Sequence, residues 1–326
     1  MVLCWDRFAG GLIVGYLHWR LIFFVNIPIG LVGLFLVYWH LPDYRERTNP
    51  LDVTGLILFG SGVALLSYVL EVFGEHTLST AEILGLLVLS IFLLAGYGFH
   101  ATRSAYPMLR LTLFRIRTFR AAVAGSFVTR LGIGGIPFLF PLLYQVGLGL
   151  TPVQSGLLMM PQAIAAMSLK VTMPRILSRI GYRGVLISNT LIIGLMILLF
   201  AAIGKATPVW LIVAEVFCYG FFTSLQYTSM NTLVYADVTE EEASGASSIA
   251  STMQQMAISF GVASASLVTV FFLPSRYGSN TEQFIRGIHH AFFVLGGMTL
   301  LSTIVFSELK RGDGDSVSQG KGLHGG

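Results

Sequence analysis

The stretch VLISNTLIIGLMILLFAAIG, residues 185–204, is twenty residues long and contains no charged side chain. In an α-helix, about 20 apolar residues at ~1.5 Å per residue cross the ~30 Å hydrocarbon layer of a bilayer. The stretch therefore predicts a transmembrane helix. A strand of a membrane barrel is excluded because it would alternate apolar and polar residues, which this run does not.

Runs of the same kind recur along the 326-residue chain and are separated by short polar breaks. Hydrophobic residues make up 54% of the chain and charged residues only 11%, against about 25% in soluble domains. A soluble protein of this size cannot bury that much apolar surface. We predict an all-α, polytopic membrane helical bundle. Its nine spans are expected near residues 20–40, 53–73, 81–100, 121–146, 153–172, 185–204, 208–232, 248–273 and 288–307.

The first residues do not form a complete span. Residues 8–17, FAGGLIVGYL, have the composition of the second half of a span, whereas residues 1–7, MVLCWDR, are polar and irregular. They also lack the basic region and the small-residue cleavage site of a signal peptide. We therefore expect the chain to start inside a helix, as an N-terminally truncated sequence would.

Lysine and arginine are divided unevenly between the two sets of alternate loops. One set holds fourteen: Arg45, Arg47, Arg103, Arg110, Arg115, Arg117, Arg120, Lys170, Arg175, Arg179, Arg183, Lys310, Arg311 and Lys321. The other set holds four: Arg20, Lys205, Arg276 and Arg286. Because basic loops stay on the cytoplasmic side of a membrane, we expect the first set and the C-terminus to face the cytoplasm.

The loops are too short to contain an extramembrane catalytic domain. The longest, residues 101–120 (ATRSAYPMLRLTLFRIRTFR), interleaves arginine with leucine, phenylalanine and isoleucine. This pattern is typical of an amphipathic segment at the membrane surface whose arginines meet anionic headgroups. Nucleic-acid binding is the weaker alternative for the same basic cluster. The tail, residues 309–326, is polar and rich in glycine, so we expect it to be disordered.

No motif for a nucleotide, a metal or an enzymatic nucleophile is present. The two Gly-Lys pairs are not followed by serine or threonine, as a phosphate-binding loop requires, and GxSxG, HExxH and CxxC motifs are absent. His289 and His290 are adjacent, so they point to different faces of a helix and do not predict a metal site. We predict a protein that is not an enzyme and uses no cofactor, and any uphill transport would draw on an ion gradient.

Two ionisable residues fall inside predicted spans. Arg130 lies about 13 Å into the span 121–146, and Glu215 lies about 10 Å into the span 208–232, at helical rise. A charge at that depth costs several kcal/mol and is retained where it lines a cavity or meets a partner. Both are candidate transport residues. The alternatives are a structural tie between helices for Arg130 and contact with interfacial water for Glu215.

Polar amides and prolines collect in the same half of the chain. The amides that we take as candidate cavity residues are Gln145, Gln162, Gln226 and Asn231. Pro137, Pro141 and Pro161 interrupt the neighbouring helices and free backbone carbonyls, as broken helices beside a substrate path do. A proline kink that only shapes the helix is the alternative.

Several stretches together resemble one family. HWRLIFFVNIPIGL (18–31) resembles a segment that follows the fifth span in the fourteen-span drug:proton antiporter branch of the major facilitator superfamily. AGGLIVGYL (9–17) resembles the end of the antiporter motif GPxxGG of that branch, of which Gly10 and Gly11 remain. Asp6 and Arg7 stand where the motif has glycine and proline.

The second half carries the rest of the resemblance. PFLFPLLYQVGLGLTPVQSGLLMMPQAI (137–164) is similar to the pair of spans that opens the C-terminal half of the family, and residues 229–263 are similar to the last cytoplasmic loop and the span after it. PRILSRIGYRGVL (174–186) resembles the cytoplasmic loop GxLaDRxGRR, with matches at Arg179, Gly181 and Arg183. Ser178 stands where that loop has an acidic residue.

The resemblance implies a fold and a domain organisation. The nine spans would be the sixth to fourteenth of the family, so the bundle would lack the first four to five helices. The expected parts are a remnant of the N-terminal helical domain (1–40), two central linker helices with an amphipathic cytoplasmic segment (41–120), a C-terminal six-helix transport domain (121–308) and a disordered cytoplasmic tail (309–326). The spans carrying Arg130 and Glu215 would line the cavity.

The resemblance also implies a function. A chain of this kind would be a multidrug efflux transporter of the bacterial inner membrane that exchanges amphipathic, drug-like molecules for protons by alternating access. Arg179 and Arg183 would latch helix ends and gate closure. No nucleic acid or nucleotide is expected as a partner. The alternative is a fragment or an assembly subunit of such a transporter that carries nothing by itself.

Overall fold

The computed structural model describes residues 21–40, 51–73, 78–104, 107–272, 281–310 and 312–314. All regular structure in those ranges is helical. The elements are α2 (Leu21–His40), α3 (Val53–Phe73), α4 (Thr80–Arg103), the 3-10 helix η1 (Leu111–Arg115), α5 (Arg117–Ile133), α6 (Ile136–Pro141), the π-helix η2 (Leu142–Gly147), α7 (Pro152–Leu199), the 3-10 helix η3 (Phe200–Ala202), α8 (Val209–Leu233), α9 (Glu240–Phe272), α10 (Thr281–Leu301) and α11 (Thr303–Phe306). Gly10 and Gly11 lie outside the described residues.

Helices cover all nine predicted spans, and the predicted fold class is confirmed. Within the described residues, six helices are long and apolar enough to cross a membrane. They are Ala81–Arg103, Arg117–Gly147, Arg175–Ala202, Val209–Leu233, Glu240–Phe272 and Thr281–Phe306. The shorter apolar segments Gly30–His40 and Val53–Val69 fall in the first two predicted spans.

Two helices begin at side-chain caps that their sequences supply. Ser79 precedes α4 and accepts a hydrogen bond from the backbone N–H of Glu82, whose carboxylate accepts one from the N–H of Ser79 in return. Thr151 and Gln154 form the same reciprocal box at the start of α7. These caps satisfy backbone donors that a helix leaves free in its first turn.

The span predicted at 121–146 is divided into three pieces. α5 ends at Ile133, a short α6 follows, and η2 continues in the wider π-helical hydrogen-bonding pattern. Pro137 and Pro141 cause the division, because proline has no N–H to give to the preceding turn. The backbone of Leu148 instead bonds to the carbonyl of Leu143, 2.9 Å away.

The spans predicted at 153–172 and 185–204 lie in one helical segment, α7, which is interrupted at Gly181. Gly181 has φ 73° and ψ 162°, a backbone conformation that essentially only glycine adopts. Helical structure therefore runs through most of the loop expected at 174–186, and the chain reverses over one residue.

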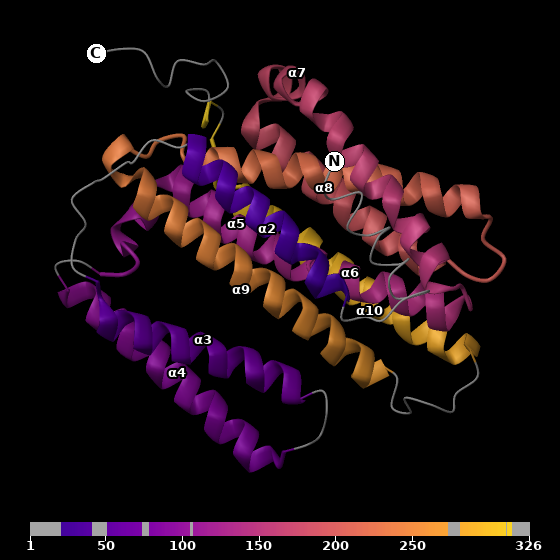
Figure 1. Cartoon of the computed structure of the whole chain (residues 1–326), viewed down its shortest axis with the longest axis horizontal. Helices are drawn as coiled ribbons and strands as arrows, with labels where there is room; N and C mark the ends of the chain where they lie inside the picture. Colours follow the sequence, from indigo (N-terminus) through magenta and orange to yellow (C-terminus); the bar gives the residue numbers. More distant parts are fainter. Residues whose placement is uncertain are drawn as a thin grey trace.

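Helices α5 to α11 form the main body of the protein (Figure 1). α7 packs on α8, α5 packs on α9, and α10 lies against α5, α7 and α9. The core has two clusters, one of which is centred on the aromatic rings of Phe140, Phe200, Tyr219 and Phe292. The hairpin of α3 and α4 lies at one side of this body, where α3 contacts α9.

Small residues permit the close crossings inside the body. A Cβ on Gly132 of α5 would lie 2.7 Å from the carbonyl oxygen of Leu295 on α10. A Cβ on Gly220 of α8 would lie 2.5 Å from the carbonyl oxygen of Gln162 on α7. Glycine at these positions lets helix backbones approach, as is common where helices pack in membranes.

Candidate transport site

Arg130 is buried in α5 with 6% of its surface exposed. Its Nε donates a hydrogen bond to Ser126 Oγ, 3.0 Å away on the preceding turn. Its guanidinium carbon lies 3.9 Å from the centroid of the Tyr227 ring on α8. No ion pair joins Arg130 to a carboxylate among the described residues. The aromatic face is therefore the main partner of this buried cation.

Tyr227 is a partner of Arg130 that the sequence alone did not reveal. Its partner Arg130 lies 97 positions earlier, and a tyrosine inside an apolar run carries no signal that separates a cation partner from a core residue. The contact joins α5 to α8, which are the two helices expected to line the cavity. It therefore gives the predicted Arg130 site a second, aromatic member.

Glu215 lies on α8 about 18 Å from Tyr227 along the helix axis, at the other end of the span. Its side chain is half-buried, and its Oε2 atom is buried with no hydrogen-bond partner in the described structure. The carboxylate interacts electrostatically with Tyr144 in η2, whose hydroxyl is also buried and unpartnered. Unpaired buried polar atoms cost free energy and are retained mainly where a site uses them.

The structure thus separates the two predicted ionisable residues. Arg130 pairs with Tyr227 at one level of α8, and Glu215 lies at another, within electrostatic range of Tyr144. Tyr144 belongs to a π-helix, a distortion that is frequent at functional sites. Gln145, the next residue, is half-buried in the same distorted segment.

Gln226 is fully buried and lies in a hydrogen-bond network between α7 and α8. Asn189 Nδ2 donates to Gln226 Oε1 at 2.9 Å and to the carbonyl of Phe222 at 2.7 Å. Gln226 Nε2 donates to Thr190 Oγ1 at 2.8 Å. Both ends of the Gln226 amide are engaged, so in this conformation it holds two helices together.

The other two amides are placed at different positions. Asn231 Oδ1 accepts a hydrogen bond from Gln254 Nε2 at 2.9 Å, which links α8 to α9. Gln162 lies where α7 crosses α8 at Gly220. The six candidate residues therefore do not converge on one point.

The predicted gating loop is a sharp bend. Gly181 makes the reversal, Arg179 is exposed beside it, and the Nε atom of Arg183 is buried with no hydrogen-bond partner in the described structure. Tyr182, between them, is 2% exposed.

Two ion pairs connect the start of α5 with residues 308–313. Arg117 Nε lies 3.1 Å from Asp313 Oδ2, and Arg120 Nη2 lies 3.3 Å from Glu308 Oε2. Burial alone would raise the pKa of Asp313, but the hydrogen bonds from Arg117 and from the Lys310 N–H outweigh it and hold that pKa below its ordinary value.

The ordered fold extends past the boundary expected at residue 309. Leu309 is 1% exposed, and a Cβ on Gly314 would lie 2.5 Å from the Tyr182 ring. The expectation of a disordered tail therefore does not hold for these first residues, because an apolar side chain and the Asp313 ion pair anchor them. Residues 315–326 lie outside the described residues.

Comparison with known proteins places this arrangement in a family. The model of the Major Facilitator Superfamily matches residues 7–262 and 123–322. Three relatives are each named "Putative multidrug resistance protein MdtD". The protein of Serratia proteamaculans is 35% identical over 87% of the chain, and that of Yersinia enterocolitica is 31% identical over 92%. The protein of Escherichia coli is 35% identical over 90% of the chain. The chain spans 58%, 64% and 62% of their lengths. The family predicted from the sequence motifs is confirmed: this multi-pass membrane protein belongs to the major facilitator superfamily, a family of transporters and not of enzymes.

Proposed function

We propose that this chain is a multidrug efflux transporter of the bacterial inner membrane that exchanges its substrates for protons by alternating access. The proposal rests on one observation above all, the buried Arg130 held under the Tyr227 ring between α5 and α8. A cation and an aromatic face at mid-span suit amphipathic molecules that combine apolar rings with a polar group. The names of the relatives, which describe multidrug resistance proteins, support the same substrate class.

Glu215 is our candidate for the proton site. A carboxyl group inside a span can carry a proton across the low-dielectric layer as a neutral group and release it to water. Its Oε2 atom has no hydrogen-bond partner in the described structure, and Glu215 interacts electrostatically with Tyr144. Glu215 and the Arg130–Tyr227 pair are separated along the axis of α8. This separation fits an exchange in which the proton and the substrate bind at different depths in the membrane.

Alternating access needs helix ends that can lock and unlock. We assign this role to the basic end of the body, which we orient toward the cytoplasm together with the C-terminus. Arg117 and Asp313 hold α5 to the chain end there, and the bend at Gly181 carries Arg179 and Arg183. Opening would exchange these contacts for water and for the partner half of the transporter.

The alternative is a fragment or an assembly subunit that does not transport by itself. One observation favours it: the chain spans 58% of the Serratia relative. In that case the body from α5 to α11 folds but needs a further helical domain to form a complete cavity.

Dye efflux from a pump-deficient bacterial host tests both functions. Cells expressing the chain alone are compared with cells that also express the N-terminal half of a relative. Efflux in either strain that stops when a protonophore collapses the proton gradient supports the exporter. Efflux by the chain alone excludes the fragment, whereas no efflux in either strain, with both chains detected in the membrane, excludes the exporter.

A further inference from the structure

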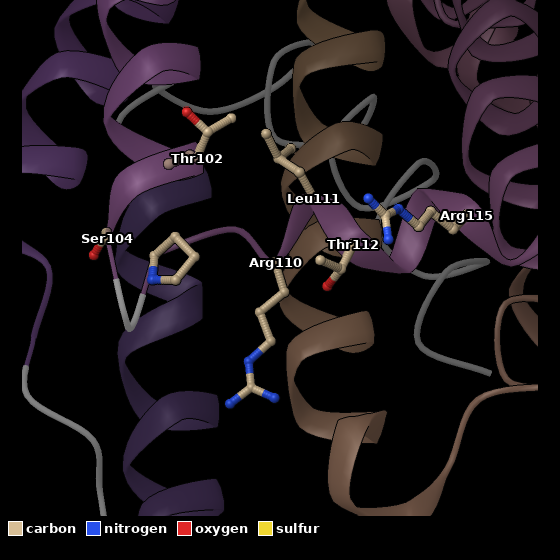
Figure 2. A pocket seen from close by; sticks show the side chains of 8 residues that line it. Thr102, Ser104, Arg110, Leu111, Thr112 and Arg115 are labelled. Atoms are coloured by element: carbon tan, nitrogen blue, oxygen red, sulfur yellow. The ribbon is translucent and has the colours of Figure 1, made fainter.

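A cavity of about 570 Å³ opens between the end of α4 and η1, away from the site described above (Figure 2). Its lining combines hydroxyl, cationic and apolar side chains. The labelled residues in Figure 2 are Thr102, Ser104, Arg110, Leu111, Thr112 and Arg115. The side chains of Thr102 and Leu111 face each other across the opening.

The two arginines of this cavity differ from their neighbours in sequence. Arg117 and Arg120, immediately downstream, are neutralised by Asp313 and Glu308. No such ion pair is found for Arg110 or Arg115 within the part of the chain that the structure describes. Two uncompensated guanidinium groups on one cavity make a local positive field.

Arg110 is exposed, and its Cδ atom lies 3.7 Å from the place that a Cβ of Gly245 on α9 would occupy. Arg110 immediately precedes η1 and Arg115 ends it, so the two cations flank one short helix. The hydroxyls of Ser104 and Thr112 add neutral hydrogen-bond donors to the same lining.

The cavity lies at the level where the membrane surface is expected. It falls between Arg103, which ends one span, and Arg117, which begins the next. Leu111, one of its lining residues, is 39% exposed. An anion that enters the cavity therefore has an exposed apolar side chain beside it.

We propose that this cavity binds a phosphate group, and that an anionic phospholipid of the surrounding leaflet supplies it. Guanidinium groups form short, charge-assisted hydrogen bonds with phosphate oxygens. The apolar lining residues Pro107 and Leu111 give the acyl chains of that lipid a surface to lie on.

Native mass spectrometry of the 326-residue chain in detergent tests the proposal. The probes are phosphatidylglycerol, phosphatidylcholine and inorganic phosphate. The test variant is Arg110→Gln/Arg115→Gln, and the control, Arg175→Gln/Lys205→Gln, removes the same charge from two exposed basic residues outside the cavity. Circular dichroism and size-exclusion chromatography establish that each variant is helical and monodisperse. If the double variant does not purify, Arg110→Gln and Arg115→Gln are measured singly.

Phosphatidylglycerol should bind the unmodified chain and the control about twenty-fivefold more tightly than the test variant, since each of the two basic side chains contributes on the order of a fivefold factor near a membrane surface. Phosphatidylcholine should show no such difference. Arginine-dependent retention of phosphatidylglycerol alone assigns the site to a lipid. Equal displacement by inorganic phosphate supports a phosphate site filled from solution. Retention that is the same in all three proteins, or is lost equally in the control, overturns the proposal.

Discussion

The guanidinium carbon of Arg130 lies 3.9 Å from the centre of the Tyr227 ring, so a cation that α5 buries is covered by an aromatic face from α8. Removing a cation from water without a partner costs several kcal/mol. The ring and the hydroxyl of Ser126 replace part of the lost hydration. The pair therefore joins two helices and keeps a positive charge inside the span.

Replacement of Arg130 by alanine should abolish drug resistance in the complete transporter while membrane abundance stays unchanged. The guanidinium is the positive group at this level, and alanine removes it without adding bulk. Resistance is measured as growth on inhibitory dyes in a pump-deficient host, with abundance followed by immunoblot. Arg120→Ala, on the exposed part of the same helix, is the control. Full resistance in the Arg130→Ala strain would refute the role assigned to Arg130.

Tyr227 offers a matched pair of substitutions. Tyr227→Phe keeps the ring face over Arg130, so efflux should remain close to that of the unmodified protein. Tyr227→Leu removes a desolvated cation–π contact worth about 2 kcal/mol, and efflux should fall by roughly ten- to thirtyfold if the pair acts in transport. Initial rates of dye efflux from energised cells decide the matter. Equal rates for phenylalanine and leucine would show that the ring has no such function.

Much of the fold could be predicted from the sequence, because a span needs a minimum apolar length and the chain has nine runs that reach it. The division of the span 121–146 could be predicted only in part. Pro137 and Pro141 predict a break in the helix. Whether the chain then continues as an α-helix or as a π-helix depends on how its side chains pack. Likewise, the polar composition of the tail predicts disorder, whereas the ion pair of Asp313 with Arg117 forms only in the folded protein and leaves no signal in the sequence.

The candidate site was predicted less completely than the fold. Arg130 and Glu215 were identifiable because charge is costly in lipid, and that cost acts whatever the partner is. Their partners Tyr227 and Tyr144 were not identifiable, since each contact joins residues from separate helices. The same holds for Gln226. An amide in an apolar run indicates that hydrogen bonds are needed, but it does not indicate which helix provides their partners.

Gly181→Ala should destabilise the protein by about 1–3 kcal/mol, the usual cost of a non-glycine residue in that backbone region. A Cβ there would meet no atom within 4 Å, so the cost comes from the backbone conformation of φ 73° rather than from a clash. Gly297→Ala is the control, because Gly297 has the same open space but lies in the helix α10. Thermal unfolding followed by intrinsic fluorescence should show a lower midpoint for Gly181→Ala only. Equal midpoints for both variants would contradict the strain.

The α3–α4 hairpin should lose stability in acid through Asp52. Its carboxylate accepts hydrogen bonds from the backbone N–H groups of Gly55, at 2.8 Å, and Met108, at 3.1 Å, and lies 2.8 Å from His100 Nε2. Burial alone would raise the pKa of Asp52, but these hydrogen bonds outweigh it and place that pKa below its ordinary value of 3.8. A lowered folded-state pKa means that the ionised carboxylate stabilises the fold above the unfolded pKa, and that this stabilisation is lost as pH falls through the folded pKa.

Asp52→Asn tests this dependence because asparagine is nearly isosteric and can still accept a hydrogen bond from the Gly55 N–H. At neutral pH the unmodified protein should unfold at a higher temperature than the variant. The difference in midpoint should stay constant down to about pH 4 and shrink below it, as the carboxylate becomes protonated. His100→Gln separates the histidine contact from the two backbone contacts. In the His100→Gln background, the difference in unfolding midpoint between Asp52 and Asp52→Asn should become smaller but should not vanish. A midpoint difference that is the same at pH 7 and at pH 3 would show that the charge of Asp52 contributes nothing to the hairpin.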